Sequence, residues 1–137
     1  MKRLVLDCSV TMAWCFEDEE DSSAESLLDD TRQATIHVPC VWTLEVANVL
    51  LVGERRGRLS EAKVKDLLNR IQQMPVEQEP APDSQTVTRI LSLARRYGLS
   101  AYDAAYLELA MRLGIPLATL DERLRKAADA AGVKSAL

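Results

Sequence analysis

Short runs of apolar residues alternate along the chain with longer stretches in which apolar residues recur at helical spacing. The short runs are typical of strands that are buried on both faces. We expect strands at residues 3–6, 35–38, 75–78, 116–119 and 132–135. Strands that alternate with helices form a mainly parallel sheet with helices on both faces. The pattern therefore predicts an α/β protein, a three-layer α/β/α sandwich of about five strands and seven helices.

The helices are predicted from their apolar spacing and from the residues at their ends. Serine or aspartate stands before several helical stretches, where its side chain can accept a hydrogen bond from a free N–H. Gly57, Gly98 and Gly114 each follow a helical stretch and provide a stop. We expect helices at residues 10–16, 22–33, 39–56, 60–74, 83–97, 100–113 and from 121 onward.

The length and composition predict one globular domain, residues 1–137. Of its residues 47% are hydrophobic and 28% charged, which is enough apolar surface for a single core. No apolar stretch reaches the roughly 18 residues that a membrane span needs. The three cysteines are odd in number and lack CxxC spacing, which favours small buried thiols over a disulfide framework or a zinc site. We therefore expect a cytoplasmic protein in a reducing compartment.

Two of the predicted strands end in an aspartate that leads into a helix. Leu4-Val5-Leu6 is followed by Asp7, and Leu117-Ala118-Thr119-Leu120 by Asp121. Ligands bind at the carboxyl ends of parallel strands, most often where the strand order reverses. Both aspartates are therefore candidates for chemistry, although Asp121 is equally placed to cap the last helix.

Glu45 and Asp103 are acids within largely apolar helical segments. A buried, unpaired Glu45 would be costly, and a cation or an arginine partner would each remove that cost. Asn48 lies three residues further on the same helical face. Asp103 follows Ser100 at the spacing of a capping box, so a capping role competes with ligand binding.

Oxygen ligands dominate the candidate site. Ser9 and Thr119 add hydroxyls near the strand ends, and the single histidine, His37, lies in a predicted strand and is expected to be a core residue. Four carboxylates gather in one place only if a cation lies among them or if some of them are protonated. Oxygen donors without a histidine or cysteine cluster favour Mg²⁺ or Mn²⁺. We expect Asp7, Glu45, Asp103 and Asp121 to be both metal ligands and catalytic groups.

Four motifs together carry a family resemblance. They are LVLDCSV at the start, LEVANVL around Glu45, LSAYDAAYLELA around Asp103 and PLATLDERL around Asp121. With these four motifs in this order, the chain resembles a PIN domain, and more narrowly the VapC-type ribonuclease toxins of bacterial toxin–antitoxin pairs. The resemblance implies metal-dependent hydrolysis of RNA phosphodiester bonds by a metal-activated water. It also assigns the four acids as metal ligands, with the hydroxyls of Ser9 and Thr119 supporting them. Asn48, by its place on the helical face of Glu45, is expected either to support Glu45 or to contact a ligand.

The resemblance implies partners as well. They are an RNA substrate such as tRNA or another structured RNA, a cognate antitoxin protein and a second copy of the chain in a homodimer. The formal net charge of −4 argues at first against RNA, but much of the acidity is concentrated in residues 17–21. Basic residues that suit the rim of an RNA site are Arg55, Arg56, Arg58, Arg95, Arg96, Arg123, Arg125 and Lys126.

Two other functions remain open on the residues alone. A haloacid-dehalogenase-like phosphatase would also use an aspartate after the first strand as its nucleophile, but such enzymes carry a second aspartate where this chain has Ser9. A non-catalytic receiver or RNA-binding module would use the acids only to hold an ion. Tyr102 and Tyr106 lie four residues apart and suit either packing or stacking on RNA bases.

Overall fold

The computed structural model describes residues 2–16 and 34–137. Its strands are β1 (Lys2–Leu6), β2 (Ala34–Val38), β3 (Val76–Gln78) and β4 (Leu117–Ala118). Its helices are α1 (Cys8–Cys15), α3 (Trp42–Arg55), α4 (Glu61–Gln72), α5 (Ser84–Tyr97), α6 (Ala101–Leu113) and α7 (Glu122–Ala130). The helix expected at 22–33 lies outside the described residues.

The sheet is parallel, and β1 is one of its two inner strands. The strand order is β3-β2-β1-β4. Val5 pairs with His37 of β2 on one side and with Leu117 of β4 on the other. The chain therefore builds outward from β1 through β2 and β3, and then returns to the opposite side of β1. This reversal lies between β1 and β4, where parallel sheets commonly bind ligands at their carboxyl ends.

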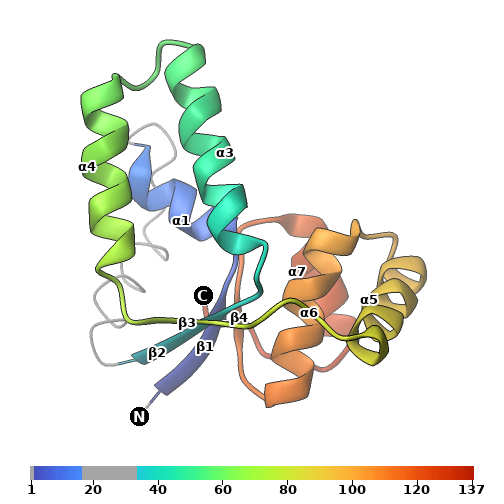
Figure 1. Cartoon of the computed structure of the whole chain (residues 1–137). Coiled ribbons are helices and arrows are strands. Elements are labelled where there is room, and N and C mark those ends of the chain that lie inside the picture. The colour runs from blue at the N-terminus through green and yellow to red at the C-terminus, as the bar shows by residue number, and fades with distance from the viewer. Residues whose placement is uncertain (1, 17–33) are drawn as a thin grey trace.

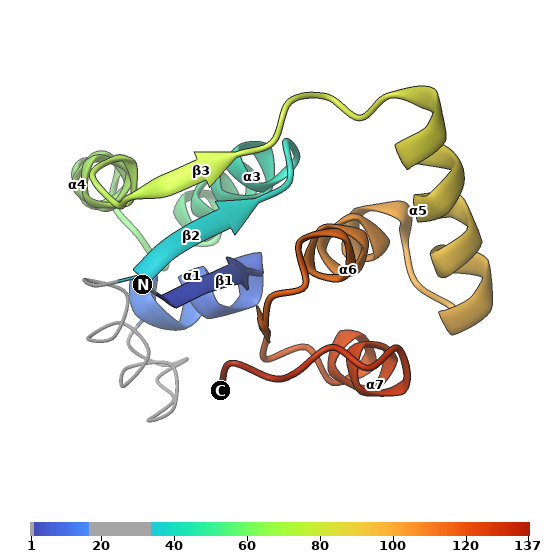
Figure 2. The same cartoon turned by 90° about the horizontal axis from the view of Figure 1, so that it is seen from below.

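The helices form two groups about the sheet. Figures 1 and 2 show α1, α3 and α4 together on one side of the molecule and α5, α6 and α7 together on the other. Helix α3 packs against α1 and α4, while α6 packs against α5, α7, β1 and β4. The carboxyl-terminal part of β1 is fully covered, since Val5 and Leu6 have no exposed surface. The expected α/β sandwich is confirmed.

The last predicted strand is reduced to a single bridge. Of residues 132–135 only Ser135 pairs with β4, in a bridge to Leu117, whose N–H donates to the Lys134 carbonyl at 3.0 Å. Two features of the chain explain the difference. Pro116 lacks an N–H with which to lengthen β4, and Gly132 adopts a left-handed turn (φ 80°) directly after α7. The expectation of a strand at 132–135 was therefore wrong, and the described sheet has four strands.

The helix ends follow the predicted caps. Ser60, Asp83, Ser100 and Asp121 each accept a backbone N–H at the start of a helix. Gly98 and Gly114 follow α5 and α6 in the left-handed conformation. In the part of the chain that the structure describes, no helix is both long and apolar enough to cross a membrane.

Candidate active site

Asp7 lies at the centre of the site, directly after β1. Its N–H donates to the Ala118 carbonyl at 3.0 Å, so the pairing of β1 with β4 brings Thr119 beside it. One carboxylate oxygen, Oδ2, accepts hydrogen bonds from Thr119 Oγ1 at 2.7 Å and from Ser9 Oγ at 2.8 Å. The residue is only 5% exposed. Burial raises the pKa of Asp7 above its ordinary value, while the two hydroxyls act in the opposite direction.

The two hydroxyls also join the loops on either side of the site. Ser9 Oγ accepts the N–H of Leu120 at 2.9 Å, and Thr119 Oγ1 accepts the N–H of Asp121 at 3.0 Å. The start of α1 is thereby tied to the turn that follows β4. Ser9 and Thr119 lie where the sequence predicted supporting hydroxyls.

Glu45 reaches the site from the first turn of α3. It is half-buried, and its Oε1 accepts a hydrogen bond from the phenol of Tyr106 at 2.6 Å. Burial raises the pKa of Glu45, the phenol opposes this, and the charges of Asp7 and Asp103 raise it further. Among the described residues no arginine or lysine pairs with Glu45, so its partner is a neutral phenol. Asn48 is exposed one turn further along α3.

Asp103 and Asp121 both lie at helix starts, as predicted. The N–H of Asp103 donates to Ser100 Oγ at 3.1 Å, and Asp121 Oδ1 accepts the N–H of Leu124 at 2.9 Å. Burial raises the pKa of the half-buried Asp103, as do the charges of Asp7 and Asp121, while Arg123 lowers it. Asp103 therefore interacts with both Asp7 and Asp121, and a place at a helix start does not exclude either Asp103 or Asp121 from the site.

The four acids influence one another and are here called the acidic edge. The charge of Asp7 raises the pKa of Glu45 and Asp103, and the charge of Asp121 raises that of Asp7 and Asp103. Within residues 2–16 and 34–137, no three acidic, histidine or cysteine side chains are close enough to form a ready-made metal site. The acidic edge is thus an open cluster. Its oxygen donors and uncompensated charge suit Mg²⁺, which is usually held by one or two carboxylates and keeps several waters.

The remaining candidate ligands lie elsewhere. His37 is buried, and its Nε2 accepts a hydrogen bond from Arg3 Nε at 3.3 Å, which confirms the expected core histidine. Cys8 is buried and Cys40 is half-buried, and neither of these two residues forms a disulfide. The acidic edge therefore offers only oxygen ligands.

Two side-chain contacts escaped the sequence reasoning. Tyr106 is fully buried and bonded to Glu45, whereas Tyr102 is 62% exposed, so packing describes Tyr106 but not Tyr102. The only signal for the Tyr106 contact was its position one turn after Asp103 on α6. A contact with Glu45, 61 residues away, depends on how α3 and α6 approach each other.

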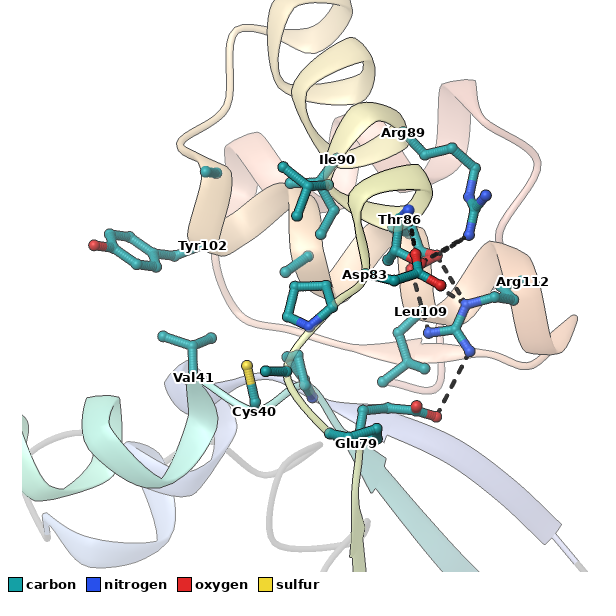
Figure 3. A pocket seen from close by; sticks show the side chains of 18 of the residues that line it. Cys40, Val41, Glu79, Asp83, Thr86, Arg89, Ile90, Tyr102, Leu109 and Arg112 are labelled. Carbon is teal, nitrogen blue, oxygen red and sulfur yellow. Dashed lines mark hydrogen bonds and ion pairs between the residues drawn. The ribbon is translucent and has the colours of Figure 1, made fainter.

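The second missed feature is a cluster of paired charges, here called the Glu108 cluster and formed by Glu79, Arg89, Glu108 and Arg112. Arg112 Nε donates to Glu108 Oε1 at 2.8 Å, and Arg89 reaches the same oxygen at 3.5 Å. Arg112 also lies 3.7 Å from Glu79. These residues line a cavity of about 530 Å³ beside α5 and α6 (Figure 3). The spacing of Glu108 and Arg112, four residues apart on one helix, was the available signal.

Residues 4–130 match the PIN domain family. The chain is 30% identical over 122 residues to "Ribonuclease VapC3" of Pyrobaculum aerophilum, an alignment that covers 89% of this chain and 92% of the relative. The crystal structure of PAE2754 from the same organism superposes with a TM-score of 0.72 at 20% identity, covering 99% of this chain and 88% of that one. A structure of VapBC2 from Rickettsia felis, bound to a DNA fragment from their promoter, gives a TM-score of 0.64 at 11% identity, covering 91% and 92% of the two chains. These solved structures share the fold.

Proposed function

The chain belongs to the PIN domain family, and from this premise we propose that it is a metal-dependent endoribonuclease toxin of a VapBC-type toxin–antitoxin pair. The observation that carries the proposal is the acidic edge. Burial and repulsion between the acids raise the pKa of Asp7, Glu45 and Asp103. A cluster that opposes its own ionisation is suited to a bound cation. The relative from Pyrobaculum aerophilum, named as a ribonuclease, supports the same reaction.

The residues have distinct roles in this proposal. Asp7, Glu45 and Asp103 would hold Mg²⁺ or Mn²⁺, and Asp121 would complete the site. Such an ion, when bound, supplies a water of lowered pKa and positive charge against the developing charge on the phosphate. Ser9 and Thr119 keep Oδ2 of Asp7 hydrogen-bonded and so fix the carboxylate. Asn48 lies on the exposed face of α3, where it can contact the RNA.

Arg123 is our choice among the basic residues for binding the RNA backbone. It lies in the first turn of α7, and its charge lowers the pKa of Asp103. An exposed cation at the edge of an acidic site can hold a phosphate without occupying the metal position. Arg125 instead stabilises the turn after β4, because its guanidinium donates a hydrogen bond to the Thr119 carbonyl at 3.2 Å.

The proposed partners are an RNA such as tRNA, a cognate antitoxin and a second copy of the chain. The antitoxin is supported by the shared fold of VapBC2, whose structure includes its promoter DNA. The homodimer rests on the family resemblance. An RNA substrate and a protein antitoxin also imply action in the cytoplasm.

The test is cleavage of a structured RNA by the purified chain with Mg²⁺ or Mn²⁺, with and without EDTA, beside Asp7→Asn. We expect cleavage that EDTA and the substitution both abolish, while Asp66→Asn on α4 cleaves like the wild type. Release of phosphate from small esters without RNA cleavage would indicate the phosphatase. RNA binding without cleavage by the metal-loaded protein would indicate the non-catalytic module.

A further inference from the structure

Tyr106 connects the two helices that carry Glu45 and Asp103. On α6 it lies one turn after Asp103, and its hydroxyl crosses to Glu45 Oε1 on α3 at 2.6 Å. The residue has no exposed surface, so its ring is fixed by the core around it. The position of the phenol oxygen is therefore determined by packing rather than by solvent.

The phenol is the one hydrogen-bond donor to the Glu45 carboxylate within the described part of the chain. A glutamate side chain turns about three bonds, and a hydrogen bond from a buried, rigid donor selects one orientation. Because the phenol is neutral, it leaves the negative charge of Glu45 in place. An arginine at the same position would have cancelled that charge, as Arg112 does for Glu108.

We propose that Tyr106 is a positioning residue that holds the Glu45 carboxylate in the orientation with which the acidic edge binds its divalent cation. This inference rests on the proposed function. It assigns one oxygen of Glu45, Oε1, to the phenol, and the other oxygen would be available to the cation. Partners of this kind behind a metal ligand commonly change metal affinity by about 10- to 100-fold when they are removed.

The test compares Tyr106→Phe with wild type by titrating Mn²⁺ into the RNA-free protein and measuring the bound ion by electron paramagnetic resonance. The substitution removes the hydroxyl and keeps the ring, so the packing is retained. We expect Mn²⁺ affinity to fall by about 10- to 100-fold. In RNA cleavage, the Mg²⁺ concentration for half-maximal rate should rise, and the rate at saturating Mg²⁺ should fall much less. Tyr97→Phe on α5 is the matched control and should change neither.

A double-mutant cycle shows whether Tyr106 acts through Glu45. In the Glu45→Gln background, the added Tyr106→Phe substitution should leave Mn²⁺ affinity unchanged, because the ligand that the phenol orients is already lost. A second loss of affinity in that background would overturn the proposal. So would a Tyr106→Phe protein with lower thermal stability but wild-type Mn²⁺ affinity, or one that fails to fold, since both outcomes describe a purely structural hydroxyl.

The experiment distinguishes a failure of this inference from a failure of the proposed function. If the wild type binds Mn²⁺ and cleaves RNA but Tyr106→Phe matches it, the positioning role is wrong and the nuclease stands. If the wild type neither binds Mn²⁺ nor cleaves RNA, the proposed function itself is wrong, and the inference is overturned with it.

Discussion

Two nearly buried carboxylates in this protein have opposite surroundings. Asp7 is 5% exposed and Glu108 is 3% exposed. Asp7 accepts hydrogen bonds from two neutral hydroxyls and is influenced by the negative charge of Asp121. Glu108 instead accepts hydrogen bonds from two arginines. The fold therefore supplies a cation at one carboxylate and only dipoles at the other.

The difference separates a carboxylate whose charge is neutralised within the fold from one whose charge is available to the proposed cation. A buried carboxylate needs a partner, because its desolvation is otherwise costly. The Glu108 cluster meets this need internally and joins α5, α6 and the end of β3. At the acidic edge, the hydroxyls and the Tyr106 phenol fix the carboxylates but leave their charge uncompensated. The comparison predicts that substitutions at the acidic edge change activity, whereas substitutions in the Glu108 cluster change stability.

The largest expected effect is on catalysis at the acidic edge. Asp103→Asn should lower the rate of the proposed metal-dependent RNA cleavage on the order of a hundred- to a thousandfold, because it removes one of the charged groups proposed to hold the metal. Its free energy of unfolding without metal should be unchanged or higher, since one member of a self-repelling cluster is gone. Cleavage kinetics and urea unfolding measure the two effects. A variant that loses stability but keeps its rate would place Asp103 in the same class as Glu108.

The opposite result is expected for the Glu108 cluster. Glu108→Gln should lower the free energy of unfolding by about 1–3 kcal/mol, because Arg112 and Arg89 lose their common buried acceptor. Both arginines are at least a third exposed and can turn to solvent, which limits the loss. The folded variant should cleave RNA at the wild-type rate. Glu79→Gln is the control and should lose less than about 1 kcal/mol, because its ion pair with Arg112 is long, at 3.7 Å, and only partly buried.

The fold was predicted well where a local signal determines it. Apolar runs and caps placed the four strands and the described helices, because each element contains its own pattern. The expected strand at 132–135 failed for the opposite reason. A strand at 132–135 would have to pair with β4, so its length depends on how many residues β4 offers. The apolar run at residues 116–119 gave no sign that β4 is only two residues long.

The site was predicted only in part, for a related physical reason. Asp7 and Asp121 were found from strand ends, and Asp103 from a helix start, all of which are local features. The partner of Glu45 was missed, because Tyr106 is distant in sequence and meets it only when α3 and α6 pack. The sequence left Glu45 with either a cation or an arginine, and the structure adds a neutral donor that is compatible with a cation.

The pH dependence of stability offers a third, smaller contrast. Burial raises the pKa of Asp7 above 3.8, so the folded state holds a proton that the unfolded state has released. The contribution of this proton to folding stability is complete below the pKa that Asp7 has in the unfolded state. It is lost as pH rises through the pKa that Asp7 has in the folded state. Relative to Asp7→Asn, metal-free wild type should therefore lose stability as pH rises from about 4, by at most about 1.4 kcal/mol per pH unit. Urea unfolding across this range measures the difference.

Metal should suppress that contrast. On the proposed function, Mg²⁺ binds the ionised acidic edge of the folded state and stabilises that state by mass action. Adding Mg²⁺ at pH 7 should then raise the stability of wild type more than that of Asp7→Asn. Glu108→Gln should respond to Mg²⁺ as the wild type does. Equal Mg²⁺ effects on wild type and Asp7→Asn would contradict a cation at Asp7.

The smallest expected effect concerns Arg123, the one cation shown to influence the acidic edge within the described residues. Arg123→Gln should weaken RNA binding several-fold and reduce the slope of log affinity against log salt concentration by about 1, the value for one lost phosphate contact. Arg70→Gln on α4, which removes an exposed ion pair with Asp66, should leave both unchanged. Filter binding at several salt concentrations provides the measurement. Arg123→Gln could instead leave the salt-dependence slope unchanged and alter the Mg²⁺ dependence of cleavage. In that case Arg123 acts on Asp103 and not on RNA, as Arg112 and Arg89 act on Glu108.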